Sequence, residues 1–241
     1  MSEEILFISD LHLSLEKPEI TRRFLDFLEK RATQASSLYI LGDLFDAWIG
    51  DDDPTPPNFK IRNQFKQLTQ SGTAVYFQPG NRDFLLGKRF CLDTGITLLD
   101  DYAVIELMGL TTLLTHGDLL CTDDLPYQAF RTISHTIKWQ QNVLSKPLLI
   151  RLLAARWYRF RSYLHKRKKS QSIMDVNQET VIRVMQEHDC LRLIHGHTHR
   201  PNIHDFLINN HPAQRFVLSA WSKETGEVLC WNNKGYQIET L

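Results

Sequence analysis

The chain has 241 residues, of which 42% are apolar, 23% charged and 10% aromatic, and its 28 basic and 28 acidic side chains give zero net charge. This composition is typical of a globular protein that buries a sizeable core, and it excludes a disordered, collagen-like or low-complexity chain. No apolar run approaches the ~20 residues that a membrane-spanning helix needs.

Short β-branched runs alternate with helical patterns along the first half of the chain. Five apolar runs are predicted to be strands: 5–8, 38–41, 74–77, 111–115 and 191–194. Apolar spacing predicts helices at 19–35, 59–70 and 175–187, with Asn58 as the cap of the second. Three C-terminal runs, at 216–219, 228–231 and 236–239, are predicted to be antiparallel strands. Strand–helix alternation followed by a series of strands favours a layered α/β fold.

Each of the first five predicted strands ends in a polar tag, often with glycine. The tags are Asp10-Leu11-His12, Gly42-Asp43-Leu44-Phe45-Asp46, Gly80-Asn81-Arg82-Asp83, His116-Gly117-Asp118 and Gly196-His197-Thr198-His199. Ligands bind at the carboxyl ends of strands in α/β sheets, so tags that are far apart in the sequence can converge on one site.

The tags supply carboxylate, amide and imidazole groups that suit a divalent metal such as Mn, Fe, Co, Ni or Zn. The candidate ligands are Asp10, His12, Asp43, Asn81, His116, His197 and His199. Seven ligands are too many for one ion but suit two ions ~3.5–4 Å apart that share a carboxylate. Each tag alone is common in proteins without a metal, whereas five in this order predict a dinuclear site.

The ordered pattern D-x-H, G-D-x-x-D, G-N-x-D, H-G-D and G-H-x-H resembles the calcineurin-like metallophosphoesterases from Asp10 to His199. The resemblance implies a four-layer α/β/β/α sandwich. It also implies two sets of metal ligands that share Asp43 as a bridge. The first set is Asp10, His12, Asp43 and His199, and the second is Asp43, Asn81, His116 and His197.

Arg82 stands where many members of that family carry a histidine that donates a proton. Arginine does not give up a proton near neutral pH, but its planar guanidinium can bind a phosphate through two donors. We therefore expect Arg82 to stabilise charge, which fits a pyrophosphate substrate because a phosphate leaving group needs little protonation. The predicted catalytic residues are Arg82, Asp43 and His197.

A basic insertion separates H-G-D from G-H-T-H. The fifty residues between Asp124 and Asp175 contain eleven Lys or Arg and no acid, so the remainder carries a net charge of −11. This segregation predicts an anionic partner at one local surface: phosphate, anionic lipid or nucleic acid. Residues 147–161 form a helical pattern that is apolar nearly all round. It is predicted to be a helix packed on the body with its charges in water, an acyl-binding and membrane-contacting element, or both.

The length, G-N-R-D and the insertion at about 124–170 together resemble the bacterial UDP-2,3-diacylglucosamine pyrophosphohydrolases of lipid A biosynthesis. The resemblance implies that hydroxide activated by two metal ions, typically Mn²⁺, attacks the α-phosphate and releases UMP and 2,3-diacylglucosamine 1-phosphate. It also implies one domain over residues 1–241 with an inserted helical cap, and a peripheral position on the cytoplasmic face of the inner membrane. The implied substrate contacts are Asn81, Arg82, Asp124, Ser162, Lys166, Lys169 and His197, with Asp123 as an alternative to Asp124.

Two alternatives remain open. One is another phosphoesterase of this fold that acts on phosphoprotein, cyclic nucleotide or DNA, and the other is a non-catalytic binding module. The full ligand set argues against the binding module, and the apolar insertion argues against a soluble substrate. Nucleic acid is not an expected partner, because the aromatic–basic interleaving of strand-binding folds is missing.

Two further groups are given structural interpretations. The acidic run Asp51-Asp52-Asp53 before Pro54 is predicted to be a solvated loop. The four cysteines are far apart, contain no C-x-x-C pair and follow no recognisable export signal, so they are predicted to be reduced thiols in the cytoplasm.

Overall fold

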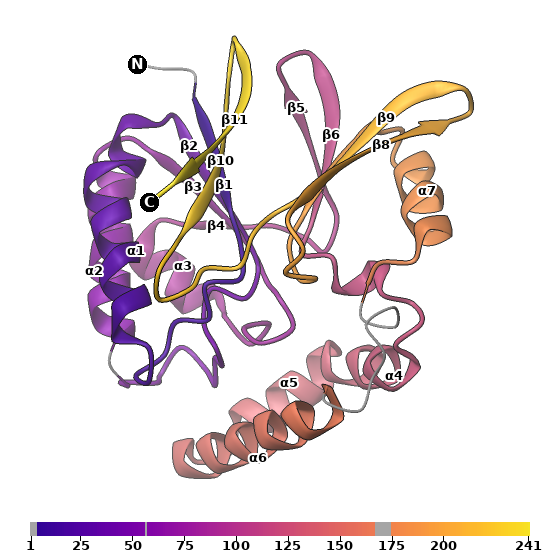
Figure 1. The fold of residues 1–241 in the computed structure, drawn as a ribbon. Coiled ribbons are helices and arrows are strands. Elements are labelled where there is room, and N and C mark those ends of the chain that lie inside the picture. Colours follow the sequence, from indigo (N-terminus) through magenta and orange to yellow (C-terminus); the bar gives the residue numbers. More distant parts are fainter. Residues whose placement is uncertain (1–3, 56, 167–174) are drawn as a thin grey trace.

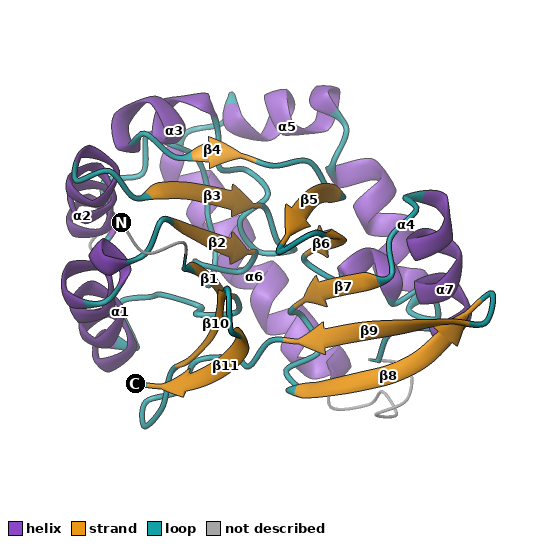
Figure 2. Ribbon diagram, turned by 90° about the horizontal axis from the view of Figure 1, so that it is seen from above, coloured by secondary structure: helices purple, strands orange, loops and turns teal. Residues whose placement is uncertain are grey.

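The computed structural model describes residues 4–55, 57–166 and 175–241, with the side chains of 160–166 left aside. Two β-sheets form the centre of the molecule (Figures 1 and 2). The first has the order β11-β10-β1-β2-β3-β4, and the second has the order β5-β6-β7-β9-β8. The strands of the first sheet are β1 (Ile5–Ile8), β2 (Ser37–Leu41), β3 (Ala74–Gln78), β4 (Thr97–Leu98), β10 (Glu227–Asn232) and β11 (Gly235–Thr240). Those of the second are β5 (Ala103–Leu107), β6 (Leu110–Thr115), β7 (Arg192–His195), β8 (Asn202–Ile208) and β9 (His211–Val217).

Helices cover the outer face of each sheet. Those on the first sheet are α1 (Pro18–Lys30), α2 (Asn58–Gln70) and α3 (Lys88–Thr94), and α7 (Gln178–Glu187) lies on the second. Three more helices, α4 (Leu125–Ser134), α5 (Ile137–Leu144) and α6 (Leu148–Lys166), lie between β6 and α7 in the chain. We call residues 125–166 the helical insert. Figure 1 shows α5 and α6 below the two sheets.

Successive side chains of a strand point to opposite faces, and this alternation divides the interior into three cores. In β1, Leu6 and Ile8 pack toward α1 and α2, whereas Phe7 packs between the two sheets with the residues of β7 and β9. In the second sheet, Leu113 and Leu193 pack against α7. The three cores separate four layers, which confirms the predicted α/β/β/α sandwich.

The strands that carry the polar tags are parallel within each sheet. β1 pairs with β2 and β2 with β3 in the first sheet, and β6 pairs with β7 in the second. Their carboxyl ends therefore meet at one edge of the sandwich, and Figure 1 shows that this edge faces α5 and α6. The fold thus places all five tags at the edge of the sandwich that faces the helical insert.

Most predicted elements are confirmed to within a few residues, and the differences have local causes. The first helix ends at Lys30 rather than at 35, because a 3₁₀ turn follows at Ala32–Gln34. Asn58 is not the cap of α2 but its first residue, because Pro57 holds the cap position and the Asn58 amide donates to Asp53. The prediction lacked α3, β4, β5 and β8, and it gave no separate α4 or α5 within the helical cap that the resemblance implied. It also placed at 216–219 the strand that the structure has at His211–Val217. No helix among the described residues is long and apolar enough to cross a membrane.

Residues 51–53 form a loop, as predicted, and Asp52 is exposed, but each carboxylate has a partner and Asp53 is buried. Asp51 accepts hydrogen bonds from the backbone N–H groups of Gly87 and Phe90 at the start of α3. Asp52 forms an ion pair with Arg151 of α6. Asp53 is 9% exposed and accepts from Thr55 and Asn58. The acidic run is therefore a structural junction among α2, α3 and the helical insert.

Candidate active site

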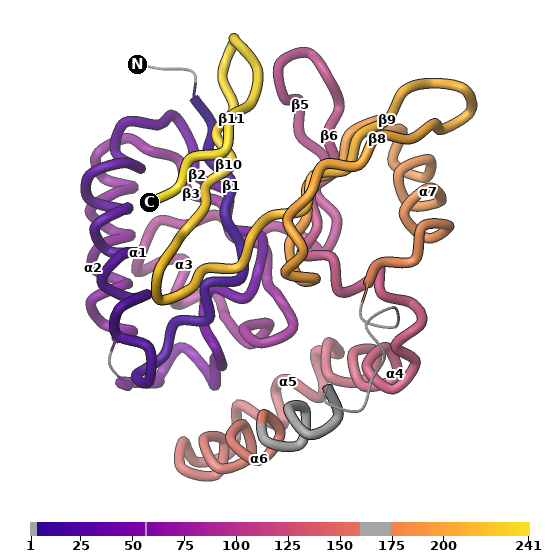
Figure 3. Tube along the Cα trace, in the orientation of Figure 1, coloured from indigo at the N-terminus to yellow at the C-terminus, as the bar shows by residue number. Residues whose placement is uncertain are grey.

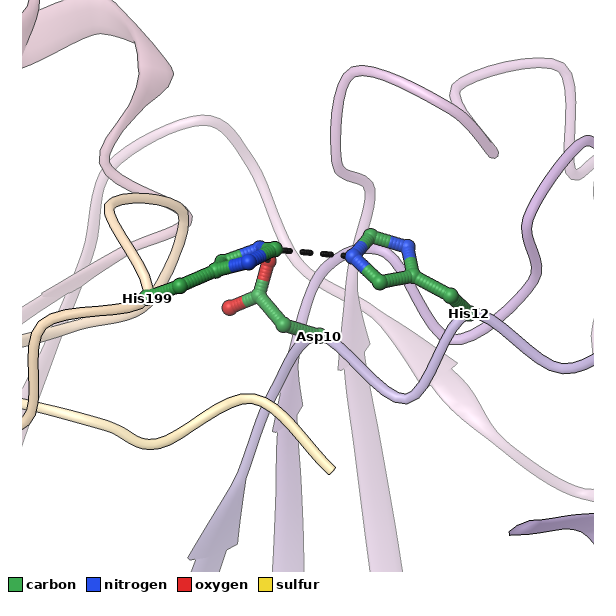
Figure 4. A group of neighbouring side chains, drawn as sticks. All are labelled: Asp10, His12 and His199. Carbon is green, nitrogen blue, oxygen red and sulfur yellow. Dashed lines mark hydrogen bonds and ion pairs between the residues drawn. The ribbon is translucent and has the colours of Figure 1, made fainter. Parts of the chain in front are cut away.

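The first group of candidate ligands joins the loop after β1 to the loop after β7. His199 Nε2 lies 3.1 Å from Oδ1 of the fully buried Asp10 and 3.3 Å from Nε2 of His12 (Figure 4). Three potential ligand atoms from two distant segments are therefore within reach of a single ion.

The second group joins the loops after β3, β6 and β7. Asn81 Oδ1 lies 3.1 Å from Nε2 of His116 and 3.0 Å from Nδ1 of His197. The two histidine nitrogens are 3.2 Å apart. An amide oxygen and two imidazoles thus converge on one point.

Asp43 lies between the two groups. Its Oδ2 is 3.8 Å from Nδ1 of His12, and its Oδ1 is 3.7 Å from Nε2 of His116. Asp10 also approaches the second group. One ligand atom from each of Asp10, Asp43 and His116 lies within 4.8 Å of the other two. The structure thus brings all seven predicted ligands together, and the carboxylate of Asp43 faces both sets.

The donor atoms suit a divalent cation. Nδ1 of His12 is buried and has no hydrogen-bond partner among the described residues. Nδ1 of His116 donates to the carbonyl oxygen of Leu41 at 2.9 Å, which leaves the lone pair of Nε2 facing Asn81 and Asp43. Oxygen and imidazole donors without a thiolate are the ligands of borderline-hard divalent metals.

Electrostatics in the cluster favour added positive charge. Burial raises the pKa of Asp43, and the positive charges of His116 and Arg82 offset this only in part. Burial opposes the charged form of His116, but the carboxylates of Asp43 and Asp10 outweigh it and raise the pKa of His116 to about 9. Burial together with Arg82 lowers the pKa of His12, so that imidazole is neutral and can donate its lone pair.

The backbone of the ligand loops is unusual. The φ angles are +55° at Asp10, +51° at His12, +51° at Asp43, +68° at His197 and +54° at His199. Left-handed backbone is uncommon outside glycine, and Asp and His are among the residues that adopt it most readily. The same residue types that supply metal ligands therefore also suit these tight turns.

Two tag glycines allow the loops to approach each other closely. A Cβ atom on Gly42 would lie 2.3 Å from Nδ1 of His116, and one on Gly196 would lie 2.3 Å from Oδ2 of Asp10. Any larger residue at either position would displace a candidate ligand. The glycines in these tags are therefore required by contacts between loops as well as by local turns.

Arg82 lies at the edge of the ligand cluster. Its backbone N–H donates to Oδ1 of Asp43 at 2.9 Å, and its Nε is 3.5 Å from Oδ2 of the same residue. A terminal nitrogen of the guanidinium donates to Oδ1 of Asp46 at 2.6 Å. The side chain is 26% exposed, so its remaining donors can meet a bound anion.

An apolar cavity of about 900 Å³ lies between this site and the helical insert. Asn81 and Arg82 form part of its wall, which joins the cavity to the ligand cluster. Most of the rest is aromatic or aliphatic: Trp48, Phe84, Phe130, Trp139, Val143 and Trp157. The sequence analysis did not identify Phe84, Phe130 or Trp139, although the i, i+4 spacing of Trp139 and Val143 could have indicated one face of a helix.

The model of the calcineurin-like phosphoesterase family matches residues 4–201. The chain belongs to this family. It is similar to "UDP-2,3-diacylglucosamine hydrolase" of Aliivibrio fischeri (strain MJ11), with 49% identity over 97% of both chains. Proteins of the same name match from Enterobacter sp. (strain 638), at 49% identity over 97% of both chains, and from Escherichia coli O7:K1, at 51% identity over 91% of both chains. The family and the ligand cluster together identify a metal-dependent hydrolase of phosphoryl compounds.

Two motif acids of this calcineurin-like phosphoesterase hold the loops in place. Asp83 is fully buried and accepts from the backbone N–H groups of Gly80 at 2.8 Å and Phe45 at 3.2 Å. Asp118 accepts from Nε of Arg131 at 2.7 Å and from the hydroxyl of Tyr127, which ties α4 to the H-G-D loop. Their places in the tags were visible in the sequence, but their partners were not.

Unlike the candidate metal ligands, the substrate contacts predicted from the insertion are not brought together at the site by the described residues. Asp124 is the N-cap of α4 and accepts from the backbone N–H of Tyr127 at 3.3 Å, and it is absent from the cavity wall. Asp123 lies 3.3 Å from the amide of Asn177 instead. The side chains of Ser162 and Lys166, and the whole of Lys169, lie outside the described residues.

Proposed function

We propose that this phosphoesterase hydrolyses the pyrophosphate bond of UDP-2,3-diacylglucosamine to UMP and 2,3-diacylglucosamine 1-phosphate, a reaction of lipid A biosynthesis. The observation that carries the proposal is the apolar cavity whose wall includes Asn81 and Arg82 of the ligand cluster. A lipid with a polar diphosphate head matches this combination, whereas a soluble phosphodiester leaves the cavity unused. The names of relatives at 49–51% identity support the same substrate.

We propose two divalent ions per chain, most simply Mn²⁺. Asp10, His12 and His199 would hold one ion, and Asn81, His116 and His197 would hold the other, with Asp43 shared. Divalent cations in such a site acidify water and withdraw charge from a phosphoryl group. Six donors in two groups of three around the shared carboxylate of Asp43 support this count.

The side chains around the ions have separate tasks. Arg82 binds the non-bridging oxygens of the diphosphate with the donors left free beside Asp43 and Asp46, and keeps its proton throughout. Asn81 and His197 orient the α-phosphate for in-line attack by water and stabilise charge that develops on its oxygens. Asp43 fixes the backbone of Arg82 by accepting its N–H, so the cation-binding carboxylate also sets the position of the arginine.

The cavity binds the acyl chains. Its volume of about 900 Å³ is in the range of lipid-sized ligand pockets. Each buried methylene contributes about 0.8 kcal/mol, so two acyl chains can supply most of the binding free energy. In this proposal residues ~124–170 are a cap inserted in one domain of 241 residues, and Asp124, Ser162, Lys166 and Lys169 meet the polar parts of the substrate.

We also propose that the outer face of α6 contacts the anionic surface of the bacterial inner membrane from the cytoplasmic side. Leu149, Ile150 and Leu153 are 53–66% exposed and are absent from the cavity wall, and Leu153 follows the other two at spacings of four and three residues. Apolar side chains on one face of a basic helix suit insertion into the lipid headgroup region, and nearby Lys and Arg add attraction to anionic lipid. The membrane would hold the enzyme where its substrate is.

The test compares three substrates with the purified enzyme and Mn²⁺. We expect kcat/KM for UDP-2,3-diacylglucosamine to exceed that for bis(p-nitrophenyl) phosphate or a cyclic nucleotide by about 10³-fold or more, since only the lipid uses the cavity. In ¹⁸O-labelled water the label should enter UMP, because the α-phosphorus is attacked. Label in the sugar phosphate would overturn the site of attack, and equal rates on all three substrates would favour a general phosphodiesterase.

A further inference from the structure

One buried carboxylate links the catalytic site to the helical insert. Asp46 lies on the loop after β2 and is 5% exposed. Its Oδ1 accepts from Arg82 at 2.6 Å, and its Oδ2 forms an ion pair with Arg159 of α6. The backbone N–H of Asp46 donates to the carbonyl oxygen of Leu13, so the backbone that carries the carboxylate is held in place.

The contact with Arg82 restricts the guanidinium on a second side. Nε of Arg82 faces Oδ2 of Asp43 at 3.5 Å, and the terminal nitrogen faces Asp46. An arginine side chain adopts many rotamers in solution, and it is held in one of them only when fixed partners contact its planar group. Asp43 and Asp46 together hold the plane of the guanidinium, whereas Asp43 alone would leave it free to turn about Nε.

Among the described side chains, Arg159 and a second arginine of α6 hold this helix to the loop after β2. The second is Arg151, which is 5% exposed, forms an ion pair with Asp52 and donates to the carbonyl oxygen of Ile49. The two arginines are eight residues apart on α6. In the described part of the chain neither Asp52 nor Arg151 forms a hydrogen bond or ion pair with Arg82, so this pair serves as a matched control for docking of the helix.

We propose that Asp46 is a positioning residue that couples docking of α6 to the orientation of Arg82. Arg159 fixes one oxygen of Asp46, and the other oxygen then fixes Arg82 against Asp43. The inference rests on the proposed function in that α6 forms a wall of the lipid cavity. Closure of α6 over acyl chains therefore also orders the group that receives the diphosphate, so apolar contacts remote from phosphorus raise turnover.

The test is a mutant cycle on two substrates. In Asp46→Asn we expect kcat to fall about 10- to 100-fold on both UDP-2,3-diacylglucosamine and bis(p-nitrophenyl) phosphate, with KM changed less than about threefold. In an Arg82→Gln background the same substitution should lower kcat less than about twofold, because the group it positions is gone. Equal losses in the two backgrounds would show that Asp46 acts independently of Arg82 and would overturn the proposal.

Two further variants separate coupling from simple docking. Arg159→Gln should lower kcat about three- to tenfold on both substrates, and this loss should also vanish without Arg82. Asp52→Asn should raise KM for the lipid and leave kcat for bis(p-nitrophenyl) phosphate unchanged. Unchanged kcat in Arg159→Gln would overturn the coupling even if Asp46→Asn failed to fold.

Bound metal and thermal unfolding are measured for every variant before kinetics. Metal lost from folded Asp46→Asn would assign the residue to the ligand shell and overturn its positioning role. Activity on bis(p-nitrophenyl) phosphate tests the role of Asp46 separately from the identity of the lipid substrate. If the wild type hydrolyses bis(p-nitrophenyl) phosphate but not the lipid, the proposed substrate is wrong, while the cycle between Asp46 and Arg82 still decides the present inference.

Discussion

The backbone N–H of His197 donates a 2.8 Å hydrogen bond to Oδ2 of Asp10, although the two residues are 187 positions apart. Asp10 follows a strand of the first sheet and His197 follows a strand of the second. The bond therefore joins the edges of two sheets at the point where the candidate metal ligands meet. Packing between the sheets therefore sets the spacing of the candidate ligands.

Replacing Asp43 with asparagine should remove at least one metal ion and lower turnover by about 10³-fold or more, because its carboxylate faces both ligand groups. Asparagine keeps the shape of the side chain, so the fold should persist. Metal analysis and kcat with Mn²⁺ check the outcome. Two tightly bound ions in an active Asp43→Asn protein would contradict a shared carboxylate.

Arg82→Lys should not be a conservative change. Lysine can replace the charge, but it cannot face Asp43, Asp46 and a phosphate at once through a planar group. We expect kcat to fall by about 10²–10³-fold with a smaller change in KM, as for the loss of one preorganised donor. If kcat stays at the wild-type value, the role assigned to the guanidinium is wrong.

Phe130→Ser and Val143→Ser should impair hydrolysis of the lipid substrate selectively. Both side chains line the cavity, and Phe130 stacks on Tyr158 of α6 with ring centroids 4.8 Å apart. Both side chains are partly buried, and serine at either position removes apolar surface that would contact an acyl chain. We expect at least a tenfold loss of kcat/KM on the diacylated substrate and little loss on bis(p-nitrophenyl) phosphate. Equal losses on the two substrates would mean that the insert only supports the fold.

The outer face of α6 should affect membrane binding without affecting chemistry. Leu149 and Leu153 are 66% and 57% exposed and are absent from the cavity wall, so Leu149→Ser with Leu153→Ser leaves that wall intact. We expect weaker sedimentation with anionic vesicles but an unchanged rate on substrate dispersed in detergent. Rising salt should weaken binding of the wild type, because its basic residues attract anionic lipid. Vesicle binding equal to that of the wild type would remove this face from the proposed interface.

Thiol reagents should modify one cysteine in the folded protein. Burial raises the pKa of Cys121 and Cys230 to about 12 and that of Cys190 to about 11, and all three are at most 2% exposed. Burial raises the pKa of Cys91 as well, but its side chain is partly exposed. Only thiolates react, so at pH 8 we expect slow labelling at Cys91 and none in Cys91→Ser until the chain is unfolded. Mass spectrometry of labelled peptides distinguishes the four sites.

The metal centre was predictable because its signals are local. Asp10, Asp43 and His116 each follow an apolar strand, and the rule that strand ends converge needs no knowledge of distant contacts. Pairings across the chain have no such signature. Arg151 and Asp52 are 99 residues apart, and neither the spacing of the arginines nor the acidic run indicates that they meet. Residues 147–161 were predicted to form a helix that is apolar nearly all round, whereas only the structure separates a cavity wall from an exposed face.

Because the backbone at the ligand positions is left-handed, the residues that would best stabilise the fold there differ from those that activity requires. A non-glycine residue in such a conformation costs on the order of 1 kcal/mol, and the surrounding structure must hold it. His199 at φ +54° is such a position. Glycine there would relax the turn but would remove a ligand, so the variant that tolerates heat best without metal is an inactive one. Screens for thermostability alone would accordingly select against the site, and chains of this fold freed from selection for catalysis should lose their ligands at these turns early.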